Sequence, residues 1–187
     1  MLVVTGILPK IMIMPLLWAV FLYALIVMYR SGTYILRFHF DWHALRIILG
    51  RFMILAPLMT IFVTVFYPQM LFAMPRQHPL LWLTILMLYP LFSALIQEIV
   101  FRTFFAYRFN RLIASRFHLL LFNAVVFAYI HSVFGNAIAV GFSFVGALLF
   151  MSTYLKTGSV TMSTIEHSLY GNLIFTLGIG RFFYHGG

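Results

Sequence analysis

Long apolar runs separated by short polar stretches make up almost the whole chain. A membrane-spanning helix needs roughly 20 consecutive, mostly apolar residues. Six segments meet or approach that length, and none shows the period-two alternation of a half-buried strand. We therefore expect an all-α, polytopic membrane helical bundle. The predicted spans are Ile11–Tyr29, Phe52–Phe72, Pro79–Phe105, Phe117–Phe134, Asn136–Tyr154 and Ser159–Ile179.

The segments between the spans refine this picture. Arg30–Arg51 is polar and fits an interfacial amphipathic helix in which Asp41 is solvated. Met1–Pro9 is apolar, so it either lengthens the first span or adds a seventh. Glycine and proline mark the remaining breaks. They predict a linker at Ala73–His78, a kink at Pro90 and a tight turn at Gly135–Asn136.

Composition supports a single transmembrane domain over residues 1–187. The chain is 64% hydrophobic and 8% charged, with a mean hydropathy of +1.04, whereas soluble domains are about 25% charged. It has no cysteine, which excludes disulfides and thiolate chemistry. We read the net charge of +9 as basic cytoplasmic loops rather than a nucleic-acid surface. The expected surroundings are lipids, with the chain a multi-pass protein of a bacterial cytoplasmic membrane.

The distribution of basic residues predicts the orientation in the membrane. Alternate loops carry most of the arginines, and the positive-inside rule places that side in the cytoplasm. Both termini would then face outward. The basic side holds Arg30, Arg37, Arg46, Arg51, Arg108, Arg111, Arg116 and Lys156, and the opposite side holds Lys10, Arg76 and Arg181.

The few acids carry the functional signal. Only Asp41, Glu98 and Glu166 occur in the chain, and the last two lie in apolar runs. An ionised carboxylate in hydrocarbon costs several kcal/mol or more, so ionisable groups inside spans have a partner or a use. Glu98 and Arg102 are four residues apart and share one helix face, where they can form an ion pair. That pair is either structural or part of a site.

Two later spans bring histidines to a similar depth. Phe127 and His131 are four residues apart, and Glu166–His167 is followed by Gly171. Counting from the cytoplasmic end places Glu98 ~10–14 Å deep, His167 ~12 Å and His131 ~21 Å, at about 1.5 Å per residue. We expect the three groups to share one intramembrane cavity, with Phe127 packing around it.

The order of these motifs resembles the CPBP family of CAAX prenyl endoproteases, abortive-infection proteins and bacteriocin-processing proteins. The matching elements are Glu98-x-x-x-Arg102, then Phe127-x-x-x-His131, then His167 followed by Asn172, within a core of about residues 79–179. The resemblance implies an intramembrane endopeptidase in which a Glu and a His activate water and a second His with an Asn stabilises the oxyanion. It also implies hydrophobic or lipid-modified peptide substrates.

Two positions depart from the family pattern. The pattern begins Glu-Glu-x-x-x-Arg, but this chain has Gln97-Glu98, and a glutamine cannot act as a general base. Either Glu98 takes that role or Glu166 supplies the carboxylate. The family often has His-x-x-x-Asn, but Gly171 holds that place here. Asn172 lies about 100° further round the helix.

We predict that Glu98 takes a proton from water, His131 positions that water, and His167, with Asn172 if it faces inward, stabilises the oxyanion. Arg102 would hold the Glu98 helix end. We prefer a mechanism without a cofactor, although one carboxylate and two imidazoles also suit catalytic zinc. The candidate zinc ligands are Glu98, His131 and His167.

Two other function classes stay open. Loss of the usual base at Gln97 would suit a non-catalytic scaffold or immunity factor with the same fold. Membrane carboxylates and histidines would also suit a small proton-coupled transporter, although the chain lacks the internal repeat of many transporter folds.

Overall fold

The computed structural model describes residues 12–32 and 36–183, and all regular structure in this part of the chain is helical. The predicted polytopic helical bundle is confirmed. The segment Met1–Pro9 and Lys10 lie outside the described residues. Among those described, five helices are long and apolar enough to cross a membrane: Ile13–Arg30, Trp42–Phe66, Pro79–Phe109, Arg116–Phe134 and Ala137–Thr157.

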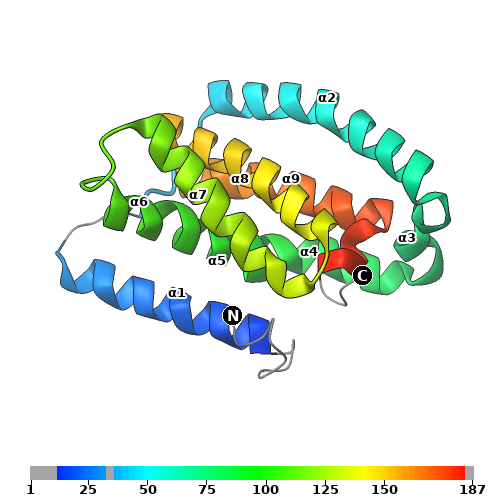
Figure 1. Ribbon diagram of the computed structural model, residues 1–187, viewed down its shortest axis with the longest axis horizontal. Coiled ribbons are helices and arrows are strands. Elements are labelled where there is room, and N and C mark those ends of the chain that lie inside the picture. The colour runs from blue at the N-terminus through cyan, green and yellow to red at the C-terminus, as the bar shows by residue number, and fades with distance from the viewer. Residues whose placement is uncertain (1–11, 33–35, 184–187) are drawn as a thin grey trace.

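The sixth expected span is also a helix, but a more polar one. This helix, α9 (Val160–Leu177), has 18 residues and buries Ser163, Glu166 and His167. Helices α1 (Ile13–Arg30) and α2 (Trp42–Phe66) lie at opposite edges of the bundle, with the other long helices between them (Figure 1). Polar residues in α9 are therefore shielded by protein rather than by lipid.

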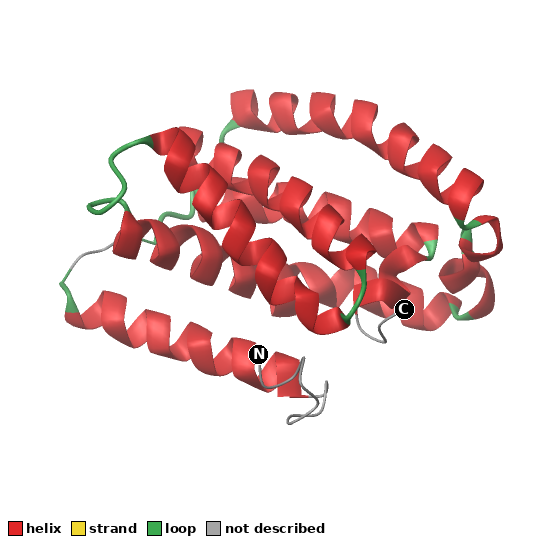
Figure 2. Ribbon diagram, in the orientation of Figure 1, coloured by secondary structure: helices red, strands yellow, loops and turns green. Residues whose placement is uncertain are grey.

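The outer helices present large apolar side chains to the outside. On α2, Met53, Ile54 and Val65 are exposed, and α1 exposes residues of the same kind. A soluble protein rarely leaves so much contiguous apolar surface uncovered, but lipid covers it without cost. Figure 2 shows that helices make up most of the part of the chain that the structure describes. The surface pattern is the one a membrane-embedded bundle needs.

The second span begins earlier than expected. We expected Phe52–Phe72, but α2 starts at Trp42, so half of the polar stretch Arg30–Arg51 is helical. Asp41 is the N-cap, and its side chain accepts a hydrogen bond from the Ala44 N–H at 3.1 Å. The expectation that Asp41 is merely solvated was wrong, because a carboxylate at this position satisfies an otherwise unpaired helical N–H.

One predicted break is helical, and the third span continues through Pro90 as expected. The linker Ala73–His78 contains the short helix α3 (Ala73–Gln77). Pro90 does not end its helix, which runs from Pro79 to Phe109 as α4 (Pro79–Tyr89), a π-helical turn, α5 (Leu95–Glu98), a second π-helical turn and α6 (Phe105–Phe109).

The last part of the chain forms a helical hairpin followed by α9. Helices α7 (Arg116–His131) and α8 (Ala137–Thr157) pack along each other and are joined by a short 3₁₀ turn, Ser132–Phe134. Gly135 has φ of 74°, a conformation that L-residues other than glycine rarely adopt, so the predicted tight turn is confirmed.

Candidate active site

Glu98 and His167 meet in the middle of the bundle. Glu98 ends α5 and His167 lies on α9, and Oε1 of Glu98 is 2.9 Å from Nδ1 of His167. The Glu98 side chain is fully buried, and His167 is 6% exposed. The ring of Phe150, on α8, stacks on the imidazole with centroids 4.5 Å apart and planes 16° apart. Both the position and the orientation of the imidazole are therefore set by packing.

Arg102 supplies the opposite charge for Glu98. Its Nε lies 3.1 Å from Oε2 of Glu98, an ion pair that does not reach the alignment of a hydrogen bond. Nη1 donates to Asn123 Oδ1 at 2.6 Å, and the guanidinium carbon lies 4.9 Å from the centre of the Phe127 ring. Arg102 is fully buried. Its charge is balanced by the carboxylate and by the negative face of an aromatic ring.

His131 presents one nitrogen to the site. Its Nδ1 is 2.8 Å from the carbonyl oxygen of Phe127, one turn earlier on α7. A carbonyl only accepts, so Nδ1 carries the hydrogen, and in the neutral ring Nε2 is an acceptor. The Phe127 ring lies 4.4 Å from the His131 ring and 6.1 Å from the His167 ring, centre to centre. Phe127 therefore packs between the two histidines, as expected for a residue that shapes the site.

A cavity of about 1020 Å³ opens beside these residues. His131 and His167 both line it, and so does Gln97, whose amide donates to Ser93 Oγ at 2.9 Å. Glu98 is not among its lining residues. The structure thus brings His131 and His167 to one cavity, but it places the carboxylate of Glu98 behind His167 rather than in the cavity wall.

Tyr89 is the residue at this site that sequence reasoning missed. It ends α4, lines the cavity, and its hydroxyl is 2.9 Å from Nε2 of His167. Gly171 allows this contact, because a Cβ there would lie 2.2 Å from Cε1 and 2.5 Å from Oη of Tyr89. The signal available in the sequence was Gly171 itself, one helical turn after His167.

Glu166 faces away from the histidines. Its Oε1 is 3.0 Å from Nη1 of Arg51 on α2, and its Oε2 accepts from Thr153 Oγ1 on α8 at 2.5 Å. Nη1 of Arg51 also donates to Thr153 Oγ1. Both oxygens of Glu166 are therefore engaged in a cluster that joins three helices. As adjacent residues on a helix, Glu166 and His167 point about 100° apart.

Asn172 also lies outside the cavity. Its Nδ2 donates to the Leu86 carbonyl of α4 at 3.3 Å, and it does not line the cavity that holds His131 and His167. The expected role of Asn172 depended on its facing inward. Here the helical offset turns it toward α4, while Gly171 takes the inward position.

The candidate zinc ligands do not converge on one point. Oε1 of Glu98 lies 2.9 Å from Nδ1 of His167 and Oε2 lies 3.1 Å from Nε of Arg102, so both oxygens of this carboxylate face protein groups. Within residues 12–32 and 36–183, no three histidine, cysteine, aspartate or glutamate side chains gather as metal ligands would.

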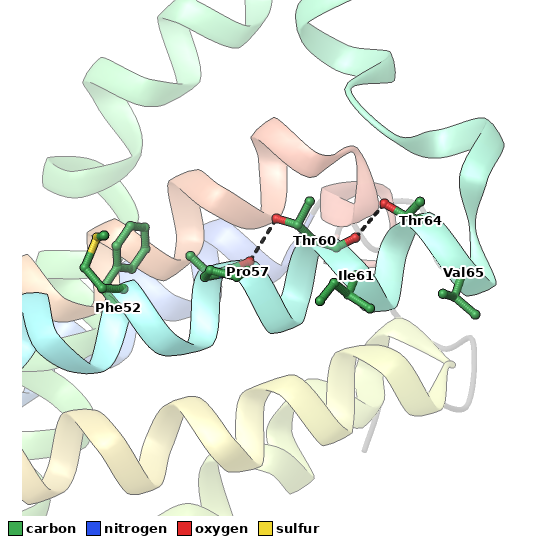
Figure 3. A pocket seen from close by; sticks show the side chains of 8 residues that line it. Phe52, Pro57, Thr60, Ile61, Thr64 and Val65 are labelled. Carbon is green, nitrogen blue, oxygen red and sulfur yellow. Dashed lines mark hydrogen bonds between the residues drawn. The ribbon is translucent and has the colours of Figure 1, made fainter.

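A second hollow, of about 540 Å³, lies on α2 and is formed by residues of that helix alone (Figure 3). Its only polar side chains are Thr60 and Thr64, whose hydroxyls donate to the carbonyls of Ala56 and Thr60 at 2.8 Å. No lining residue is titratable. The side chains that line this hollow therefore cannot act as a general acid or base.

Comparison with known families identifies the fold's relatives. The model for "Type II CAAX prenyl endopeptidase Rce1-like" proteins matches residues 79–173, which is just over half of the chain. The chain belongs to this family. The match covers Glu98, His131 and His167, so it confirms the family resemblance. Searches of curated proteins and of solved structures give no match.

Family membership makes the chain a multi-pass membrane protease of the CAAX endopeptidase type, acting on a membrane-associated peptide substrate. Within this Rce1-like chain, one further buried side chain, Asn123, supports the site and carried no motif in the sequence. Asn123 holds Arg102, and its Nδ2 also donates to the Phe101 carbonyl at 2.6 Å. The available signal was an amide in the otherwise apolar span of α7.

Proposed function

We propose that this protein hydrolyses a peptide bond of a hydrophobic or lipid-modified membrane peptide, with His167 taking the proton from water. The contact between Glu98 and His167 at the wall of the cavity carries this proposal. A histidine held by a carboxylate on one nitrogen and facing a substrate cavity with the other is the arrangement used for general-base catalysis in hydrolases.

Glu98 acts through the imidazole in this mechanism. Its Oε1 accepts the hydrogen on Nδ1 of His167, which leaves Nε2 as the basic nitrogen. When Nε2 takes a proton, the buried carboxylate stabilises the imidazolium. Arg102 fixes the other carboxylate oxygen. We first expected Glu98 to contact water directly, but both of its oxygens face protein groups, so His167 is the better candidate.

The reaction balances with the groups in place. Water gives a proton to Nε2 of His167, and its oxygen forms a bond to the scissile carbonyl carbon. The C–N bond then breaks, and the leaving amine takes the proton back from Nε2. His131, whose Nε2 is an acceptor in the neutral ring, holds the second hydrogen of the water and so aims its oxygen.

The cavity suits an apolar substrate. Its walls are mostly apolar side chains of α1, α2, α7, α8 and α9, with polar groups gathered near the histidines. Burying apolar substrate surface against such a lining contributes about 25 cal/mol per Å² removed from water. A lipid-modified or hydrophobic peptide would place its apolar part along these walls and its peptide bond beside His167.

We propose that the reaction needs no metal, since the imidazole–carboxylate pair supplies the base. The proteolysis assay tests both ideas together. Purified protein in liposomes is given a fluorogenic peptide with a farnesylated cysteine near its C-terminus, before and after exhaustive chelation. We expect cleavage in both conditions. Loss of cleavage that zinc alone restores would show a metal mechanism.

The decisive variant is Glu98→Gln. We expect kcat to fall by about 10²–10⁴, as removal of a general acid–base unit typically does. Glu166→Gln is the matched control, because both carboxylates are fully buried and paired with an arginine. It should keep most of the activity. The reverse ranking would assign the base to Glu166. A wild-type protein that cuts neither this peptide nor an unmodified hydrophobic one would support the scaffold function.

A further inference from the structure

The basic nitrogen of the proposed site is not free in the structure. Nε2 of His167 faces the hydroxyl of Tyr89 at 2.9 Å. With Nδ1 donating to Glu98, Nε2 has one lone pair, and the phenol O–H is the group that can donate to it. A water molecule can reach this nitrogen only if the hydroxyl group, oxygen as well as hydrogen, moves off its lone pair.

The ring of Tyr89 is held firmly at this place. It packs edge-on against His167, with ring centres 5.9 Å apart, and against Phe175, with centres 5.5 Å apart. Pro90 follows it and begins the π-helical turn of the same span. This packing keeps the ring beside His167, while a small tilt of the ring and rotation of its O–H can take the hydroxyl off the lone pair of Nε2.

Gly171 is the second observation that points to Tyr89. A glycine inside a helix costs about 1 kcal/mol relative to alanine. Here it lies under the phenol, where any Cβ would overlap the ring and the hydroxyl oxygen. Gly171 therefore weakens α9 locally. It also leaves the space in which the hydroxyl of Tyr89, on α4, approaches His167.

We propose that Tyr89 is a catalytic residue that donates its hydroxyl hydrogen to the carbonyl oxygen of the scissile bond. This inference rests on the proposed function. When a substrate carbonyl enters, the hydroxyl tilts off the lone pair of Nε2 of His167 and donates its hydrogen to the carbonyl oxygen. The same movement uncovers the base for water. The developing oxyanion then has a neutral donor next to the nitrogen that activates the nucleophile.

Other donors near the cavity are less well placed. The amide of Asn172 is turned to the Leu86 carbonyl of α4 and does not reach the cavity. The amide of Gln97 does line the cavity, but it donates to Ser93 and has no described contact with His167. Tyr89 alone, among the described residues, contacts both the cavity and the basic nitrogen.

The first test is Tyr89→Phe, which keeps the ring and removes the donor. With the farnesylated peptide in liposomes, we expect kcat to fall by about 10²–10³, the usual effect of losing one oxyanion donor. KM should change little, because the hydroxyl acts on the transition state. Tyr67→Phe is the control, since Tyr67 packs against Phe62 and Phe182 outside this cavity. It should retain wild-type kcat.

The second test couples Tyr89 to Gly171. In Gly171→Ala the new methyl group must push the phenol away, so this variant alone should lose kcat to a similar degree. Adding Gly171→Ala to Tyr89→Phe should then cost far less than the product of the single effects, because the two changes remove the same contact. Melting temperatures of all variants, measured in detergent, separate this loss from unfolding.

The outcomes distinguish the inference from the function it rests on. An active wild type, a folded and nearly inactive Tyr89→Phe, and a non-additive double variant support Tyr89 as the donor. Near-normal kcat in folded Tyr89→Phe would overturn the inference and leave the protease intact, as would Gln97→Leu being the variant that loses kcat. A wild type that cuts no peptide would remove the proposed function and this inference with it.

Discussion

At the residue scale, two adjacent side chains have opposite surroundings. Gln97 lines the cavity, while Glu98 is buried behind it between His167 and Arg102. The difference follows from the 100° step between neighbours on a helix. A base that contacts water directly would have to stand at position 97. A carboxylate that orients a histidine has to stand at position 98.

This difference predicts the outcome of exchanging the two residues. The double variant Gln97→Glu with Glu98→Gln keeps one carboxylate but moves it into the cavity, out of reach of Nδ1 of His167. We expect it to stay about as slow as Glu98→Gln alone, roughly 10²–10⁴ below wild type in kcat. Steady-state cleavage of the farnesylated peptide in liposomes measures this.

Gln97→Glu alone is the control for the exchange. It keeps Glu98 on His167, so it should remain active. If the exchanged variant instead recovers most of the wild-type kcat, a carboxylate in the cavity can take the proton from water by itself. The orienting role of Glu98 would then be wrong.

At the element scale, the helix Pro79–Phe109 departs from regular α-helical geometry on both sides of Glu98. It contains two π-helical turns, Pro90–Ala94 and Ile99–Phe104, on either side of Glu98. Pro90 has no N–H, so regular α-helical bonding cannot pass through it. In the second turn the Phe101 carbonyl accepts from Asn123. Such turns recur at functional sites, and here they flank Glu98, while the second one contains its partner Arg102.

A second buried ion pair connects α2 to the site-bearing helix α9. Arg51, on α2, is 3.0 Å from Glu166 on α9, and Thr153 of α8 hydrogen bonds to both. Removing one charge leaves the other without its partner. The Arg51 side chain is 23% exposed, which limits the penalty. We therefore expect Arg51→Met to lower the stability by about 1–3 kcal/mol.

Thermal unfolding in detergent measures this loss, and the exposed Arg46 of the same helix provides the control. Arg46→Met should leave the melting temperature almost unchanged. The kcat of folded Arg51→Met should stay near that of wild type, since this cluster does not touch the cavity. A large loss of kcat without loss of stability would contradict a structural role for the cluster.

At the scale of the whole molecule, the positive-inside rule predicts the orientation of the bundle. The chain has no cysteine, so single cysteines report their own side without background. Leu112→Cys lies in the loop before α7, among the arginines, and Gln77→Cys lies at the other end of the bundle. We expect the loop before α7 to be cytoplasmic.

A membrane-impermeant maleimide on intact cells tests this. Gln77→Cys should be labelled from outside, and Leu112→Cys only after the cells are permeabilised. The wild-type chain should take up no label in either condition. Labelling of Leu112→Cys in intact cells would reverse the assigned orientation and place the cytoplasmic end of the cavity outside.

Much of the fold could be predicted because it depends on local pattern. The apolar runs predicted the helices, and the structure confirms an all-helical bundle. The start of α2 could not be predicted from hydropathy, because the N-cap bond of Asp41 lets a helix begin inside polar sequence. The sequence also predicted a sixth span at Ser159–Ile179, although α9 is not among the five helices apolar enough to cross a membrane and its polar residues are buried in protein.

The sequence alone determined the class of the protein and the residues that matter. Burying a charge in a membrane is so costly that Glu98, Arg102 and Glu166 had to be paired or functional wherever the helices packed. Only the tertiary structure decided which pairing each one makes. Glu98 pairs with His167, and Glu166 pairs with Arg51. The hydroxyl of Tyr89 lies beside Nε2 of His167. Those contacts join different helices. They depend on how the helices rotate and pack against one another, which no local sequence pattern specifies.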